Sequence, residues 1–387
     1  MSIATNSKFN IKIDFDKSHD SYLYDKRTER EYLDFFGMYA SLPLGYNHEI
    51  FQTDEFKKEF MSVSSFKVNN CEFVSDETLE FDEMFTEYAG QGNYKYFHYC
   101  CTGALAVEAA IKTCLRYKNF HTPRVLSFNN SFHGINSFGN FVTSRFEAVE
   151  PKLVGMPNVY SCKVDLDLEQ VEFQLAGGQV TCILVEPIQC SVGDVHLDKD
   201  FMNGLKELSD KYNVPLVFDE IQVGFGGTGK VWYHEHLDYE PDIIIFGKKT
   251  QLSGIMVNEQ HSQTFKKGEI TRLDVTWNAD VTDMIRCKYI MKAYQKYNIL
   301  DNVSKMGDYL TQSLSTDEKL SNVRNNGLII AFDLPDTEKR NNFVNNLFLD
   351  GVLCNPTGKR SIRIRPSLSL TMQEAELAIE KIRGNKC

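Results

Sequence analysis

Short apolar runs of strand length, separated by turn-rich segments, recur through the middle of the chain. Residues 123–128 (PRVLSF), 182–188 (CILVEPI), 214–219 (VPLVFD) and 241–247 (PDIIIFG) are rich in Val, Leu, Ile and Phe. Continuous apolar runs bounded by turn residues are typical of strands that are buried on both faces of a parallel sheet. The pattern therefore predicts a sheet core in this part of the chain.

Helical spacing alternates with these runs. Residues 201–213 have it between two predicted strands, and after the turn CCTGA apolar residues recur on one helical face, at Val107, Ile111, Cys114 and Leu115. Alternating strands and helices indicate an α/β fold with a mostly parallel sheet. We assign this large domain to residues 51–288.

The two ends of the chain have the pattern of smaller elements. Short aromatic-rich runs at 22–25 and 32–36 flank a polar turn, which predicts a hairpin that has to dock on something larger. Residues 300–387 alternate helical and strand patterns. We therefore expect residues 1–50 to be the N-terminal segment, and residues 289–387 the C-terminal part, of a small α/β domain.

Composition narrows the classes of partner. The chain has 387 residues, 42% hydrophobic and 25% charged, which is typical of a folded protein. A net charge of −11 argues against nucleic-acid or anionic-membrane partners, and no run approaches membrane-spanning or signal-peptide length. The 10 cysteines are not spaced as metal ligands or as a disulfide framework, so we expect no metal, free thiols and a cytoplasmic protein.

Two charged residues end two of the predicted strands. Asp219 ends one apolar run and Lys248 follows another. Ligands of open α/β sheets bind beyond the carboxyl ends of such strands, so both side chains can enter one crevice. Pyridoxal phosphate (PLP) needs such a pair: a lysine for its aldehyde and an aspartate for its ring nitrogen. A strand end at the solvent-exposed rim of a sheet is the alternative reading of both residues.

Three other motifs could serve the same chemistry or a structural one. A helix is predicted to begin at the turn formed by Thr102 and Gly103. This helix N-terminus is either a binding site for an anion or only a connection between strand and helix, with the threonine as its N-cap. In the loop NNSFHG, Phe132 or His133 could cover a flat cofactor or fill packing space. In SIRIRP, strand periodicity puts Arg363 with Arg365 on one face, either in solvent or facing a carboxylate.

Together these motifs resemble the class III, fold-type I, PLP-dependent aminotransferases, the relatives of the ornithine, GABA and acetylornithine enzymes. The resemblance is closest to the lysine ε-aminotransferase branch. TGALAVEAAIK, FHG, VEPIQ, FDEIQVGFGGTGK, PDIIIFGKKTQLSG and the TW of VTWNAD occur in the family's order and span nearly the whole chain. The resemblance implies a PLP enzyme that uses a small-molecule amino donor and a carbonyl acceptor.

The resemblance also assigns cofactor residues. Lys248 would form the Schiff base, with Lys249 as the alternative within the doublet. Asp219 would pair with the pyridine nitrogen, and Gln222 would sit near the ring hydroxyl. The remaining assignments are backbone N–H groups for the phosphate and an aromatic ring stacked on the coenzyme, at Gly103, Ala104 and Phe132.

Two further assignments concern the substrate and the partner subunit. Thr276 would reach the phosphate bound by a neighbouring subunit, which implies a homodimer with shared active sites. Arg363 would bind the α-carboxylate of the amino donor, with Arg365 as the alternative.

The chain departs from the family at three places. Many relatives have an arginine after FHG, where this chain has Ile135, and a switch glutamate where it has Ser191. The usual GGN is replaced at 278–280. We therefore expect glutamate to aminate a terminal aldehyde on a different scaffold. One candidate for this acceptor is a sugar acid of lipopolysaccharide. It is the octulosonate Kdo, oxidised to an aldehyde at its terminal carbon (8-oxo-Kdo). The alternatives are lysine 6-aminotransferase chemistry with 2-oxoglutarate and a PLP protein that does not transaminate.

Overall fold

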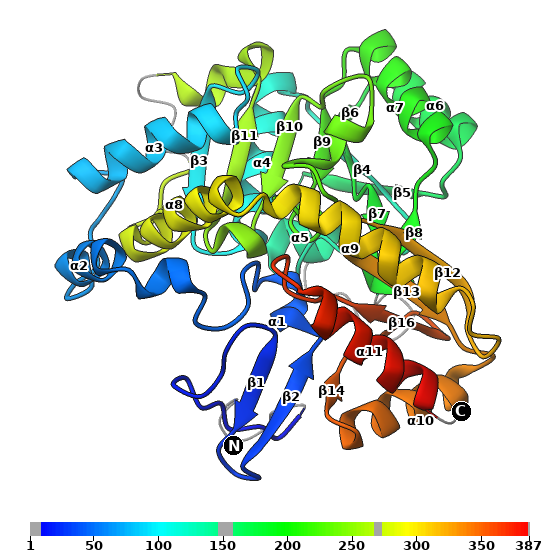
Figure 1. The fold of residues 1–387 in the computed structure, drawn as a ribbon. Helices are drawn as coiled ribbons and strands as arrows, with labels where there is room; N and C mark the ends of the chain where they lie inside the picture. The colour runs from blue at the N-terminus through cyan, green and yellow to red at the C-terminus, as the bar shows by residue number, and fades with distance from the viewer. Residues whose placement is uncertain (1–8, 146–157, 267–272, 386–387) are drawn as a thin grey trace. The chain divides into compact units, whose positions relative to one another are not determined.

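The computed structural model describes residues 9–145, 158–266 and 273–385 (Figure 1). The described residues divide into two compact units. The smaller unit is formed by residues of Met1–Lys57, Gly227–Gly229 and Ala293–Cys387, and the larger by residues of Lys58–Gly226 and Lys230–Lys292. The functional division at 50/51 and 288/289 stays a prediction.

A seven-stranded sheet forms the core of the larger unit. In spatial order its strands are β3 (Tyr96–Cys100), β11 (Ser253–Val257), β10 (Ile243–Phe246), β9 (Leu216–Asp219), β6 (Val180–Val185), β4 (Arg124–Phe128) and β5 (Tyr160–Val164). Only β11, among these strands, pairs antiparallel with its neighbours. The predicted α/β fold with a mostly parallel sheet is confirmed.

Helices cover both faces of this sheet, and strand periodicity decides which residues meet which helix. Val217 and Ile245 pack in one apolar cluster with helix α4 (Gly103–Lys118) and with α5 (Ser137–Val142). Leu216 and Phe218 point to the other face, into a cluster with α6 (Leu168–Ala176) and α7 (Lys199–Tyr212), which lie side by side in Figure 1. Burial on both faces explains why these strands are continuously apolar.

The register of the central strands sets the positions of the chemical groups that follow them. Ile245 lies opposite Asp219 in the parallel pair of β10 and β9. The chain therefore reaches Lys248 three residues beyond the level of Asp219, in a short 3₁₀ turn, η5 (Lys248–Thr250), that leads into β11. Both side chains thus emerge at the carboxyl ends of the strands, on the same side of the sheet.

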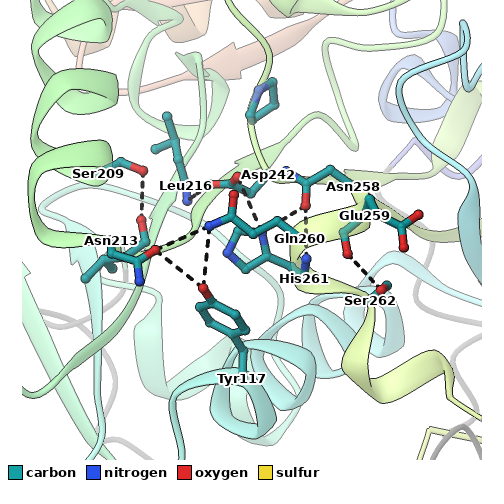
Figure 2. A network of polar contacts seen from close by, with 12 residues as sticks. Tyr117, Ser209, Asn213, Leu216, Asp242, Asn258, Glu259, Gln260, His261 and Ser262 are labelled. Carbon is teal, nitrogen blue, oxygen red and sulfur yellow. Dashed lines mark hydrogen bonds and ion pairs between the residues drawn. The ribbon is translucent and has the colours of Figure 1, made fainter.

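A polar network lies at the opposite end of the strands, beside the amino ends of β9 and β10 (Figure 2). Asp242 accepts hydrogen bonds from the Leu216 N–H and from the Asn258 side chain, both at 2.8 Å. Asn258 also caps η6 (Glu259–Phe265), accepting the His261 N–H at 3.2 Å. The network fixes the two strands and the segment after β11 to one another.

Further elements lie in the larger unit or cross its boundaries. They are α2 (Asp54–Val63), α3 (Asp76–Tyr88), β7 (Ile188–Gln189), β8 (Val195–His196), α8 (Val281–Lys296), η3 (Cys190–Val192) and η4 (Tyr233–His236). No helix among the described residues has both the length and the apolar character that crossing a membrane requires.

The smaller unit contains two sheets. The predicted hairpin is confirmed as β1 (Tyr22–Asp25) and β2 (Arg30–Asp34), and β2 pairs in parallel with β14 (Val352–Leu353). An antiparallel sheet has the order β12 (Ser321–Asn326), β13 (Ile329–Asp333), β16 (Ser361–Ile364) and β15 (Asn355–Thr357). Its helices are η2 (Glu49–Gln52), α9 (Ile299–Leu314), α10 (Thr337–Leu349) and α11 (Met372–Gly384).

The strand predicted from SIRIRPSLSL is shorter than expected. It ends at Ile364, because the Arg365 N–H donates to the Phe35 carbonyl at 2.7 Å and Pro366 has no N–H for a ladder. Arg363 and Arg365 are both buried, so the interpretation that places this face in solvent is wrong.

A left-handed turn follows β2. Gly37, Met38, Tyr39 and Ala40, labelled α1 (Gly37–Ala40), have φ between 50° and 66°. Asp34 accepts the N–H of Phe36, which precedes the turn, and that of Gly37, which begins it, both at 2.9 Å. Consecutive left-handed residues other than glycine are rare, so surrounding contacts must hold this turn.

Candidate active site

A cavity of about 290 Å³ opens at the carboxyl ends of the strands in the larger unit. Its lining comes from the start of α4 and from the segments that follow β4, β6, β9 and β10. The lining residues are Gly103, Ala104, Phe132, His133, Gly134, Ile135, Glu186, Ile188, Asp219, Ile221, Gln222, Val223 and Lys248. The six residues that the resemblance assigned to the cofactor pocket of the chain's own subunit therefore share one cavity: Gly103, Ala104, Phe132, Asp219, Gln222 and Lys248.

Two predicted site residues do not line this cavity. Thr276 is exposed on the larger unit. Arg363 belongs to the smaller unit, where it is buried, with its guanidinium carbon 5.9 Å from the centroid of the Tyr39 ring. Arg365 donates from Nη1 to the carbonyls of Ile330 and Ile364, at 3.1 and 3.0 Å. Arg365 thus binds backbone carbonyls of β13 and β16.

The first turn of α4 is suited to hold an anion. Thr102 caps the helix, since its Oγ1 accepts the Leu105 N–H at 3.4 Å. Gly103 and Ala104 follow at the cavity wall, where the N–H groups of a helix N-terminus and the helix dipole favour negative charge. A Cβ at position 103 would come within 2.8 Å of the Ile221 side chain, so glycine keeps this wall open. The capping threonine and the anion site are compatible.

The two lysines of the doublet point in different directions. Lys248 lines the cavity, in a left-handed backbone conformation with φ of 55°. Lys249 is only 2% exposed, does not line the cavity, and donates from Nζ to the Gln222 carbonyl at 2.5 Å. A coenzyme in this cavity would therefore meet the amine of Lys248 first.

Asp219 is held by a histidine that the sequence analysis did not assign. The His133 Nδ1 lies 2.8 Å from Asp219 Oδ2, and both side chains are buried. Asp219 Oδ1 also accepts the Ile221 N–H at 3.2 Å. His133 Nε2 is buried with no hydrogen-bond partner among the described residues, so Nδ1 is the nitrogen that fixes the carboxylate. The only sequence signal for this role was its place beside Phe132.

Glu186 is a second buried carboxyl group at the cavity. Its Oε2 accepts the Phe132 N–H at 2.8 Å, which fixes the loop that carries the aromatic ring. Burial raises the pKa of Glu186 to about 7, against the opposing effects of His133 and Lys248. The cavity therefore holds two carboxyl groups in different environments, which is typical of sites that handle protons.

The rest of the cavity wall is apolar. Ile188, Ile221 and Val223 line it, and Ile135 lies at its rim with 65% of its surface exposed. No arginine is among the described lining residues, although the Arg145 guanidinium carbon lies 5.9 Å from the centroid of the Phe132 ring. Ser191, at the position of the relatives' switch glutamate, is buried and is not part of the lining.

These groups would suit PLP. The cavity offers a helix N-terminus for a phosphate, an aromatic ring at Phe132 for a flat heterocycle, a buried carboxylate at Asp219 for a ring nitrogen and an amine at Lys248 for an aldehyde. Asp219, buried and fixed by His133, would lie opposite the ring nitrogen, where this coenzyme needs a carboxylate.

Comparisons with known proteins agree with this chemistry. The family model described as aminotransferase class-III matches residues 3–384. The L-lysine-epsilon aminotransferase of Mycobacterium tuberculosis (strain H37Rv) is 30% identical over 413 residues, covering 97% of this chain and 91% of that protein. The 4-aminobutyrate aminotransferase of Schizosaccharomyces pombe is 28% identical, covering 97% and 90%.

A solved structure shows the same fold. The lysine aminotransferase from M. tuberculosis superimposes with a TM-score of 0.91 at 29% identity, covering 100% of this chain and 96% of that one. Its agreement extends over the whole chain, as does that of the family model. The chain therefore belongs to the class III aminotransferases and is a PLP-dependent, fold-type I enzyme that acts on a small-molecule amino donor and acceptor.

Proposed function

We propose that the enzyme transfers an amino group from glutamate to a terminal aldehyde and forms a primary amine. The observation that carries this proposal is Ile135 at the rim of the cavity, where many relatives have an arginine for a substrate carboxylate. Loss of an ionic contact of this kind disfavours a carboxylate at that end by roughly 2–5 kcal/mol. An uncharged acceptor end is consistent with the isoleucine.

We assign the cofactor contacts to this chain as follows. The N–H groups at Gly103 and Ala104 would bind the phosphate, and Phe132 would stack on the ring. Gln222 would lie beside the ring hydroxyl, and Asp219, oriented by His133, would hold a proton at the ring nitrogen. When bound, PLP supplies a ring that accepts the electron pair left on the substrate carbon.

Proton movement in the proposed reaction falls to Lys248. Its amine would hold the coenzyme at rest and, once displaced by the substrate amine, Nζ would be the base that takes the proton from the substrate carbon. Apolar side chains in the wall, Ile188, Ile221 and Val223, would limit the water around this transfer. Glu186 would keep the Phe132 loop in place through its bond to the backbone N–H.

Donor binding is assigned to Arg363. A guanidinium can bind the α-carboxylate of glutamate with two parallel hydrogen bonds, and burial strengthens such a contact. With no arginine at position 135, we expect glutamate to be held mainly at this end.

For the acceptor, we keep a polyhydroxylated sugar acid with a terminal aldehyde, such as 8-oxo-Kdo, as one candidate. The test is a set of single-turnover reactions followed by the absorbance of the bound coenzyme. Glutamate should convert the coenzyme to its aminated form and release 2-oxoglutarate, and the sugar aldehyde should reverse the change. Failure of glutamate to convert the coenzyme would exclude it as donor.

A second candidate is L-lysine 6-aminotransferase activity with 2-oxoglutarate as acceptor. Its support is the similarity to the L-lysine-epsilon aminotransferases, at 28% to 30% identity. The same experiment separates the two, because lysine should convert the coenzyme faster than glutamate does if this second candidate is right.

We also propose that the enzyme is a homodimer with shared active sites. Thr276 lies within an apolar patch whose members are between 48% and 72% exposed: Phe66, Phe73, Val74, Val275 and Trp277. The Asn70 side chain donates to the Asn278 carbonyl at 3.0 Å, and Lys67 Nζ lies 5.2 Å from the Trp277 ring centroid. These contacts bring the two segments of the patch together. An exposed apolar patch of this kind favours a protein partner, and a second copy would cover it and receive Thr276.

A further inference from the structure

We infer that Lys249 is a positioning residue whose buried ammonium joins the turn carrying Lys248 to the turn carrying Asp219 and Gln222. The inference rests on the proposed role of Lys248 as the coenzyme lysine. It gives the second lysine of the doublet a function that neither the cavity nor the comparisons assign.

The first observation is the direction of the side chain. Lys249 is 2% exposed, and its Nζ donates to the Gln222 carbonyl at 2.5 Å. An ammonium is costly to bury unless it is hydrogen-bonded, and a charged donor makes a strong bond to a carbonyl. The contact crosses from the segment after β10 to the segment after β9, since 27 residues separate its two ends.

The second observation is the conformation of the turn that Lys249 anchors. Lys248 and Gln251 both have left-handed backbones, with φ of 55° and 63°. Such residues persist only where surrounding contacts fix them. Inside the turn, the Gln251 N–H donates to the Lys248 carbonyl at 2.9 Å, and the Thr250 hydroxyl donates to the Leu252 carbonyl at 2.5 Å. The bond from Lys249 adds an attachment to the neighbouring turn.

The third observation concerns the turn that receives the bond. Its beginning is held because the Glu220 N–H donates to the Ile245 carbonyl at 3.0 Å and Glu220 Oε2 accepts the Tyr233 N–H at 2.6 Å. Gln222, two residues on, lines the cavity and is the residue whose carbonyl Lys249 binds. Loss of the ammonium would therefore let the Gln222 end of this turn shift against Lys248.

The test compares Lys249→Met with a matched control, Lys288→Met. Lys288 is also 2% exposed, on α8, where its Nζ pairs with Glu59 and Glu80, and it does not line the cavity. Coenzyme-free protein is titrated with PLP, and the absorbance and circular dichroism of the bound coenzyme are recorded. Lys249→Met should weaken PLP binding roughly 10- to 100-fold and change the coenzyme spectrum, whereas Lys288→Met should lower stability and leave both unchanged.

Two conservative variants complete the test. Lys249→Arg and Lys249→Gln keep a donor for the Gln222 carbonyl, so they should recover part of the affinity and the spectrum, and they give a result even if Lys249→Met does not fold. Two outcomes overturn the inference. In the first, Lys249→Met binds PLP with the affinity and the spectrum of the wild type. In the second, Lys288→Met loses at least as much PLP affinity as Lys249→Met does.

Peptide mapping after borohydride reduction separates this inference from the proposed function. A label on Lys248 in both the wild type and Lys249→Met supports the assigned roles of the two lysines. A label on Lys249 in the wild type overturns the assignment of Lys248 and the inference with it. A label on Lys248 with unchanged binding in Lys249→Met overturns only the inference.

Discussion

Ile135 is the side chain on which the proposed substrate preference depends. It lies at the rim of the cavity with most of its surface exposed, so a larger polar residue can replace it without disturbing the core. The sequence identified this position only by comparison with a family pattern, and the structure adds that the residue lines the cavity.

We expect Ile135→Arg to lower the KM for glutamate roughly 10- to 100-fold, because a guanidinium restores an ionic contact for the second carboxylate. The measurement is steady-state kinetics with glutamate as the varied donor, with Ile135→Gln as the uncharged control. Arg145→Gln is the competing variant, since Arg145 lies over the Phe132 ring. A large rise in KM in Arg145→Gln would mean that the wild type already has a clamp and would contradict our interpretation of Ile135.

Glu220 gives a residue-scale prediction about pH. Burial raises its pKa to about 8, although the N–H groups of Tyr233 and His234 act to lower it. The folded pKa lies above the unfolded value, so the protonated carboxyl stabilises the fold fully below about pH 4.5, and this contribution is lost as pH rises through about 8. The slope is about −1.4 kcal/mol per pH unit in the free energy of unfolding.

Glu220→Gln mimics the protonated carboxyl and should lack that contribution to the slope. Urea unfolding of the two coenzyme-free proteins at several pH values between about 5 and 8 measures it. The stability advantage of wild type over Glu220→Gln should shrink as pH rises. A difference that does not change with pH would show that Glu220 is ionised in the folded protein throughout this range.

At the scale of elements, the carboxyl ends and the amino ends of the strands in the central sheet have separate roles. The carboxyl ends of β4, β6, β9 and β10 lead into the cavity, while the amino ends of β9 and β10 are tied by the Asp242 network (Figure 2). Substitutions at the amino ends of these strands should therefore change the stability of the protein and leave the chemistry of the cavity unchanged.

Asp242→Ala tests this separation. It leaves the Leu216 N–H and the Asn258 amide without their acceptor, which should cost roughly 2–4 kcal/mol of unfolding free energy. Asp238→Ala is the control, because its carboxylate is exposed and pairs only with a surface lysine, Lys199, among the described residues. Chemical denaturation measures the cost, and the spectrum of bound PLP should stay that of the wild type. A changed spectrum would show that the amino ends of the strands affect the cavity and would contradict the separation.

Elements with a strong apolar or aromatic signal could be predicted, and edge strands without such a signal could not. The strands β6, β9 and β10 are buried on both faces, so the sequence shows them as continuous apolar runs. The strands β5 and β12 lie at the ends of their sheets and are largely half-exposed, with sequences YSCKV and SNVRNN, so neither apolar periodicity nor turn residues marked them.

Site contacts were predictable only to the level of the strand end. Asp219 and Lys248 followed from parallel pairing, but the bond from His133 to Asp219 depends on how the loop after β4 folds. The separate directions of Lys248 and Lys249 depend on a left-handed turn, which a lysine doublet does not encode locally. Tertiary contacts decide both features.

At the scale of the whole molecule, the proposed homodimer predicts complementation between inactive variants. Lys248→Ala removes the amine of a subunit's own cavity, and Thr276→Ala removes the hydroxyl that we assign to the neighbour's phosphate site. A mixed dimer would then contain one intact site, built from Lys248 of the Thr276→Ala subunit and Thr276 of the Lys248→Ala subunit.

The experiment mixes the two variants under subunit-exchange conditions and measures PLP content and transaminase turnover. Activity above the sum of the separate variants, up to a quarter of wild type per total subunit for random exchange, is the expected result. The two variants differ in mass, so native mass spectrometry of the mixture checks that heterodimers have formed. Heterodimers that form without recovered activity would contradict shared sites.

The reversal of the chain directly after Lys248 has a consequence for how its amine, which we propose as the reactive one, can move. The polypeptide returns as β11, which pairs with both β3 and β10, so the strands before and after the turn that carries the lysine are held in ladders, and the Gln251 N–H closes the turn on the Lys248 carbonyl. Any swing between coenzyme and substrate has to come from rotations about the four side-chain torsions alone. Hydrogen exchange in this stretch should consequently be slow and almost indifferent to whether turnover is under way.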